Sequence, residues 1–132
     1  MRQSKQSLPS AQLVACIVDG MREKKAKDLV ILDLREIQQS VSDYFVIATG
    51  TADTHVDAIQ RSVQEAVYKS HQERPWHTEG TENNQWVLLD FVDVVVHVFQ
   101  EPKRNFYQLE ELWGDARIIP VSEAQPLTEI LA

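Results

Sequence analysis

The sequence contains a single cysteine, Cys16, so an intrachain disulfide cannot form. Cys16 lies within a helical pattern of apolar residues, and a lone thiol in such a place is typical of a protein of a reducing compartment. No apolar run approaches the ~20 residues needed to cross a bilayer, and the first ten residues lack the hydrophobic region of a signal peptide. We therefore expect a cytoplasmic protein without a membrane segment.

Positive charge is also scarce. The chain has 13 Lys and Arg against 20 Asp and Glu, which gives a formal net charge of -7. Binding along a nucleic-acid backbone depends on clustered Lys and Arg that release counterions, so we expect no strong direct nucleic-acid binding. An acidic surface favours a basic partner, and ribosomal proteins are the most abundant basic proteins in a cell.

The length and the composition are those of one globular domain. The chain has 132 residues, of which 43% are hydrophobic and 25% charged, and a domain of this size buries roughly two-thirds of its unfolded surface. We assign residues 1–9 to an N-terminal extension, 10–115 to the domain and 116–132 to a C-terminal tail. Whether this tail packs on the domain stays open.

The apolar periodicity predicts helices alternating with strands, followed by a hairpin. Apolar residues recur at helical spacing after Ser10, which is a suitable N-cap, and again around Thr54 and Asp57, which can cap a second helix. A last helix is expected from Pro102 to Gly114. Strands are expected at residues 28–34, 44–49, 86–90 and 93–99, with room for a short edge strand between 72 and 85.

This order of elements indicates an α/β or α+β class, with a mixed β-sheet flanked by helices. The two strands at 86–90 and 93–99 are close enough for an antiparallel hairpin linked through Phe91 and Val92.

The carboxylates do not have the spacing of a metal-dependent nucleotidyltransferase. Such an enzyme needs a Gly-Ser turn for phosphates and two carboxylates one residue apart on a strand, so that both face one metal ion. Here Thr51 and Ala52 follow Gly50, and Asp90 and Asp93 would face opposite sides of a continuous strand. We interpret both aspartates as flanking the hairpin turn and expect no catalytic residues.

The histidines offer a weak alternative. His55, His77 and His97 could converge with Glu79 or Asp90, although no tight metal-ligand motif links them. His97 lies in an apolar strand, where we expect a hydrogen-bonded core histidine. His55, near a helix N-terminus, is open between a cap and a contact with a partner. We expect no metal and no cofactor.

Three aromatic residues are candidates for a binding surface, because exposed aromatic anchors dominate interface energetics. Phe91 occupies the hairpin link, Trp86 opens its strand beside a polar loop, and Tyr107 lies about 100° around its helix from Phe106. We expect these three to form one exposed apolar patch.

Several motifs in a fixed order resemble the ribosomal silencing factor (Iojap) family. They cover about residues 13–115 and lie at 43–50, 79–80, 86–90, 93–99 and 104–113, with His55 between the first two. The resemblance implies a nucleotidyltransferase-like fold without a known reaction or cofactor, and homodimers in some members. It further implies binding to the fourteenth protein of the large ribosomal subunit, which blocks joining of the small subunit and represses translation when nutrients are limiting.

The site positions match the family motif at places expected to meet that protein. The anchors are the three aromatic residues, and the acidic rim comprises Asp90, Asp93 and Glu79. The alternative is a nucleotidyltransferase-like enzyme acting on RNA or a nucleotide, for which magnesium-dependent nucleotide incorporation would be the signature.

Overall fold

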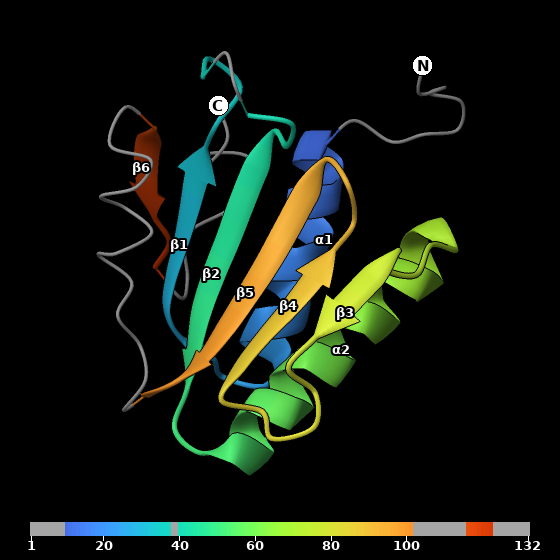
Figure 1. Cartoon of the computed structure of the whole chain (residues 1–132), viewed down its shortest axis with the longest axis vertical. Coiled ribbons are helices and arrows are strands. Elements are labelled where there is room, and N and C mark those ends of the chain that lie inside the picture. Colours follow the sequence, from blue (N-terminus) through green and yellow to red (C-terminus); the bar gives the residue numbers. More distant parts are fainter. Residues whose placement is uncertain (1–9, 38–39, 102–115, 123–132) are drawn as a thin grey trace.

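The computed structural model describes residues 10–37, 40–101 and 116–122. In chain order its elements are α1 (Ser10–Glu23), β1 (Lys27–Asp33), β2 (Tyr44–Gly50), α2 (Asp53–His71), β3 (His77–Glu79), β4 (Trp86–Asp90), β5 (Val94–Gln100) and β6 (Arg117–Pro120) (Figure 1). The predicted helix from Pro102 to Gly114 lies outside the described residues.

The strands form one sheet in the order β3-β4-β5-β2-β1-β6. Only β2 and β5 run parallel, and every other neighbouring pair is antiparallel. The predicted mixed sheet and the β4–β5 hairpin are therefore confirmed. β6 comes from residues assigned to the C-terminal tail, so the sheet continues past residue 115 and pairs a late segment with β1.

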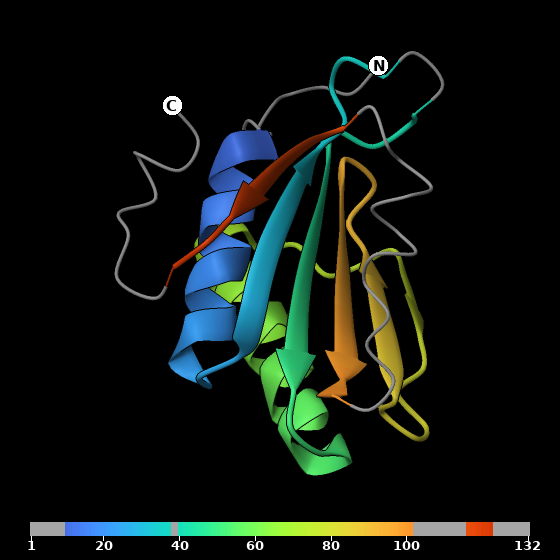
Figure 2. The same ribbon diagram turned by 90° about the vertical axis from the view of Figure 1, so that its left-hand side faces the viewer.

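Both helices pack on the same face of the sheet (Figure 2). Their apolar residues meet the strands in the main core, where Val14, Ile17, Ile59 and Val63 have no exposed surface. The two helices cross closely because α1 carries Gly20 at the contact: a Cβ there would lie 2.9 Å from Cα of Val63. Burial of the apolar residues on one side of each helix supplies the hydrophobic free energy that holds the helices to the sheet.

The strands alternate between the two faces, as their period of two requires. In β5, Val94, Val96 and Val98 belong to the main core beneath the helices. The side of the sheet turned away from α1 and α2 is called the second face here. It carries a smaller apolar cluster without any residue of α1 or α2, made of Leu32, Leu34, Ile47, Phe99 and Ala116, with Val30, Ile37 and Phe45 packed against it.

The ends of the helices differ from expectation. α2 begins at Asp53, and its N-cap Ala52 makes no side-chain capping bond, so the predicted caps at Thr54 and Asp57 are wrong. Asp57 instead accepts hydrogen bonds from Arg61 and Gln60 on the same helix. The Ser10 hydroxyl donates to Oδ2 of Asp43 at 2.7 Å, which ties the start of α1 to the segment before β2.

Candidate functional site

Trp86 is the aromatic residue that the second face exposes most clearly. It opens β4, pairs with Phe99 across the sheet, and has 49% of its surface accessible. Its ring stacks on Phe99 with centroids 4.9 Å apart and planes 27° apart. The indole N–H donates a hydrogen bond to Nδ1 of His97 at 3.2 Å. One side of the ring is thus held by the sheet while the rest is open to a partner.

His97 is buried beneath this indole, and the expectation of a hydrogen-bonded core histidine is confirmed. Its ring meets Phe45 edge-on, with centroids 4.9 Å apart. Burial lowers the pKa of His97 to about 4, so the imidazole is neutral at pH 7. Because Nδ1 accepts a hydrogen bond from the indole N–H, Nε2 carries the ring proton, and this buried atom has no hydrogen-bond partner in the part of the chain that the structure describes. We call Phe45, Trp86, His97 and Phe99 the aromatic cluster.

Phe91 does not belong to the exposed patch, and the expectation that it would is wrong. It is only 7% exposed and packs in the main core beneath the helices. The reason is the alternation along β4: Val87, Leu89 and then Phe91 point toward the helices, whereas Trp86 points to the second face. Trp86 and Phe91 therefore lie at opposite ends and on opposite sides of the strand. Tyr107 lies outside the described residues.

Asp90 and Asp93 shape the hairpin turn, as interpreted from the sequence. Oδ1 of Asp90 accepts the backbone N–H of Val92 at 2.7 Å. The carbonyl of Asp93 accepts the backbone N–H of Asp43 and of Tyr44, which joins the hairpin to the start of β2. Between them, Val92 has φ +77°. The Asp93 N–H donates to the Phe91 carbonyl, so Val92 is the central residue of a γ-turn. This conformation is strained for a β-branched residue.

Glu79 lies on the edge strand β3, opposite Leu88 of β4, which is two residues from Trp86 along the same face. Its side chain is exposed, and Oε2 is 2.8 Å from Nε2 of His77. The neighbouring Gly80 has φ +87°, and a Cβ there would lie 2.0 Å from the carbonyl oxygen of Trp86. Only glycine allows β3 to turn this closely past the start of β4.

His55 has a structural role that the sequence left open. Its Nδ1 accepts the backbone N–H of Thr51 at 2.9 Å, and its Nε2 lies 2.7 Å from the carbonyl oxygen of Lys24. His77 and His97 lie on separate strands with other partners. Within residues 10–37, 40–101 and 116–122, no group of three or more His, Cys, Asp or Glu side chains is placed to hold a metal ion.

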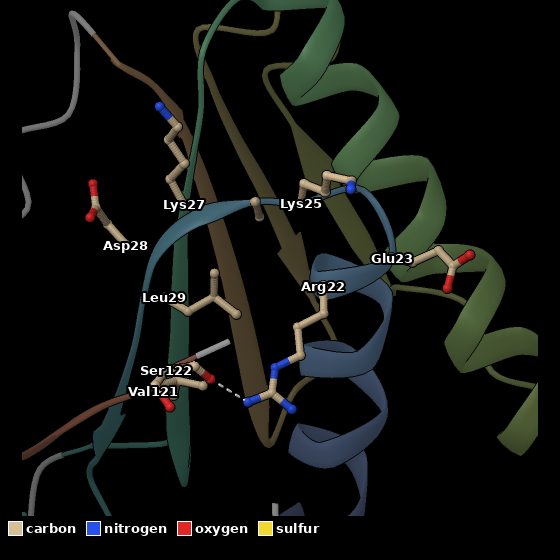
Figure 3. Close-up of a pocket in the computed structure, with 9 residues that line it drawn as sticks. Arg22, Glu23, Lys25, Lys27, Asp28, Leu29, Val121 and Ser122 are labelled. Carbon is tan, nitrogen blue, oxygen red and sulfur yellow. Dashed lines mark hydrogen bonds between the residues drawn. The ribbon is translucent and has the colours of Figure 1, made fainter. Parts of the chain in front are cut away.

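A hollow of about 630 Å³ lies where α1 turns into β1, beside the end of β6. Arg22, Lys25 and Lys27 line it together with two acidic residues. Figure 3 shows that the amino groups of Lys25 and Lys27 point away from the Arg22 guanidinium, which donates to the carbonyl of Ser122 at 2.5 Å. The positive charges do not converge, so this hollow lacks the arrangement needed to grip a small anion.

Trp76 is an exposed aromatic residue that was not predicted as a site residue from the sequence. This residue directly precedes β3, is 69% exposed, and its backbone N–H donates to the carbonyl of Asp90. It therefore lies near the opposite end of β4 from Trp86. The available signal was an aromatic residue in an otherwise polar stretch between 72 and 85, which we assigned to a loop on composition alone.

Neither helix of the described residues is both long and apolar enough to cross a membrane. What these residues do present is a stacked, half-exposed tryptophan on a sheet face with acidic and polar neighbours. Such an arrangement is typical of a protein-binding module.

Comparison with known proteins identifies the family. The family model described as "Ribosomal silencing factor during starvation" matches residues 7–130. The chain is 42% identical over 94 residues to the ribosomal silencing factor of Bacillus subtilis, covering 71% of this chain and 78% of that one. It is 36% identical over 94 residues to the chloroplastic protein Iojap of Zea mays, covering 71% and 40% of the respective chains.

Among solved structures, the fold resembles that of a protein from Chromobacterium violaceum. The TM-score is 0.75 and the identity 28%, with 95% of this chain and all of the other covered. The protein belongs to the ribosomal silencing factor family.

Proposed function

We propose that this protein acts in the cytoplasm by binding the fourteenth protein of the large ribosomal subunit and hindering the small subunit from joining. Translation is then repressed when nutrients are limiting. Family membership supports the general role, and the family description itself refers to starvation. Occupation of the intersubunit face is sufficient for this mechanism, because a steric block requires no bond to be made or broken.

The proposed contact site is supported mainly by the exposure of Trp86. Roughly half of its surface remains accessible even though Phe99 and His97 hold the ring on one side. A tryptophan that is already fixed loses little side-chain entropy when a partner covers it, and such residues are frequent hot spots. Trp86 thus replaces the three-residue patch expected from the sequence as the proposed anchor.

The surroundings of Trp86 suit a basic partner. Glu79 is exposed on the adjacent strand, and the whole chain carries an excess of seven negative charges. Charged residues at the rim of an interface chiefly raise the association rate and select the partner, while the aromatic anchor supplies most of the affinity. Asp90 and Asp93 are partly buried in the hairpin turn, and we assign them a structural part beside any rim contact.

The experiment compares two single-tryptophan variants. Trp86→Ala should weaken cosedimentation with isolated large subunits by ~2–4 kcal/mol, and should lose inhibition of subunit joining in a reconstituted assay. Trp76→Ala is the matched control, since it removes the same side chain from an even more exposed position near the other end of β4.

The two variants must first show the same thermal unfolding as the parent protein. If folded Trp86→Ala binds large subunits as tightly as the parent, the contact site is wrong. If the parent protein binds large subunits but leaves subunit joining unchanged, the steric mechanism is wrong.

A further inference from the structure

The aromatic cluster contains one polar contact that faces the proposed anchor. The indole N–H of Trp86 donates a hydrogen bond to Nδ1 of His97, and among the described residues Nε2 of His97 has no hydrogen-bond partner. His97 is 4% exposed and sits among Phe45, Phe99 and the indole itself. A polar ring buried among aromatic rings with its second nitrogen unsatisfied is costly, so a role beyond packing is expected.

We propose that His97 is a positioning residue, which holds the Trp86 indole in the orientation that the ribosomal partner meets. This inference rests on the proposed function, in which Trp86 is the anchor. His97 does not itself touch the partner, because it is covered in the free protein.

The geometry explains why a histidine suits this role. Stacking on Phe99 fixes the distance of the indole from the sheet but lets the ring slide and turn in its plane. The hydrogen bond to His97 selects one in-plane orientation, because it requires the indole N–H to point at Nδ1. A leucine or phenylalanine at position 97 would pack equally well but could not make this selection.

The protonation state of His97 also favours the hydrogen bond from the Trp86 indole. Only a neutral imidazole with the proton on Nε2 leaves Nδ1 free to accept. Burial disfavours the charged form, as the lowered pKa of His97 indicates. The cluster therefore keeps His97 in the one state that can hold the indole, throughout the neutral pH range.

The first test observes Trp86 directly, without any partner. The chain has three tryptophans, so ¹⁵N-labelled indole groups give three resolvable signals in the full-length protein. Trp86→Phe assigns the signal of interest by its loss. In His97→Leu, the Trp86 indole proton should shift and exchange faster with water, while the Trp76 signal stays in place. An unchanged Trp86 signal in folded His97→Leu would overturn the proposal.

The second test is a double-mutant cycle with isolated large ribosomal subunits. His97→Leu should weaken binding about 3- to 10-fold when residue 86 is tryptophan, the range expected from freeing one side chain. In the Trp86→Phe background, which has no indole N–H to hold, the same change should weaken binding less than about twofold. Equal weakening in both backgrounds would show that His97 acts only through general packing and would overturn the proposal.

A conservative variant guards against misfolding. His97→Gln keeps a side-chain oxygen that can accept the indole N–H, so it should restore part of the Trp86 signal and of the affinity lost in His97→Leu. If Trp86→Ala leaves binding unchanged, the proposed contact site fails, whereas the indole spectra still decide whether His97 positions Trp86.

Discussion

His55 connects two loops that are far apart in the chain. Its Nδ1 accepts the N–H of Thr51 after β2, and its Nε2 lies 2.7 Å from the carbonyl oxygen of Lys24 after α1. His55→Ala removes both bonds and should lower the free energy of unfolding by about 1–2 kcal/mol in urea denaturation. Thr54→Ala is the control: this exposed neighbour on α2 should change stability by less than about 0.5 kcal/mol. Equal effects of the two changes would argue against the connection.

Val92 stores strain at the tip of the β4–β5 hairpin. Its φ of +77° is disfavoured for a β-branched residue, and nearly half of its side chain is exposed, so little packing compensates. Val92→Gly should therefore raise the free energy of unfolding by about 1 kcal/mol, even though glycine has the more flexible unfolded state. Val41→Gly, at an exposed valine without positive φ, should not stabilise. Thermal melts of both variants distinguish relief of strain at Val92 from a general effect of replacing an exposed valine by glycine.

The buried His97 makes stability depend on pH. Its pKa in the folded protein is lowered to about 4, below the ordinary value near 6.5 in an unfolded chain. Between these two values the unfolded state binds more protons than the folded state, so stability is full above about pH 6.5 and falls as the pH drops toward 4.

The difference attributable to His97 between pH 7.5 and pH 5 should be about 2 kcal/mol. Urea denaturation of the parent protein and of His97→Gln at both pH values measures it. The pH dependence should be weaker in His97→Gln by roughly that amount. Parallel pH profiles would show that other groups account for the dependence.

Gly20 is the residue that lets α1 approach α2. Elsewhere in a helix, Gly→Ala normally stabilises by up to about 1 kcal/mol, because alanine has the higher helix propensity. At this position the new Cβ would lie 2.9 Å from Cα of Val63, so Gly20→Ala should instead destabilise by about 1–3 kcal/mol. Asp19→Ala, on the exposed side of the same turn, should stay within about 0.5 kcal/mol. Stabilisation by Gly20→Ala would mean that the helices can separate without cost.

The elements whose apolar pattern is local were predictable from the sequence. The stripe of Val56, Ile59, Val63 and Val67 fixed the second helix, and the β-branched runs at 44–49 and 93–99 fixed the central strands to within a residue. The pairing of β6 with β1 was not predictable, because Arg117–Pro120 is short and its partner is determined only by tertiary contacts.

The candidate site was harder to predict, since the exposure of a side chain on a strand depends on the face of the sheet on which it lies. Trp86 and Phe91 are an odd number of positions apart, and this alone places them on opposite sides of a strand that continues through both. A residue in a hairpin link can depart from the strand alternation, and for this reason the sequence alone does not separate Phe91 from Trp86. The hydrogen bond between Trp86 and His97 joins the neighbouring strands β4 and β5, and no spacing in the sequence indicates it.

The pairing of β6 with β1 has a consequence for how the molecule is made. Residues 117–120 lie almost ninety positions after the strand that receives them, with Val30 opposite Pro120. A chain emerging from a ribosome can assemble the hairpin and pack its helices early, but one edge of β1 has no β6 to pair with until Pro120 has been synthesised. Until then the nascent protein has an unpaired edge on β1, which β6 of the same chain covers in the complete fold.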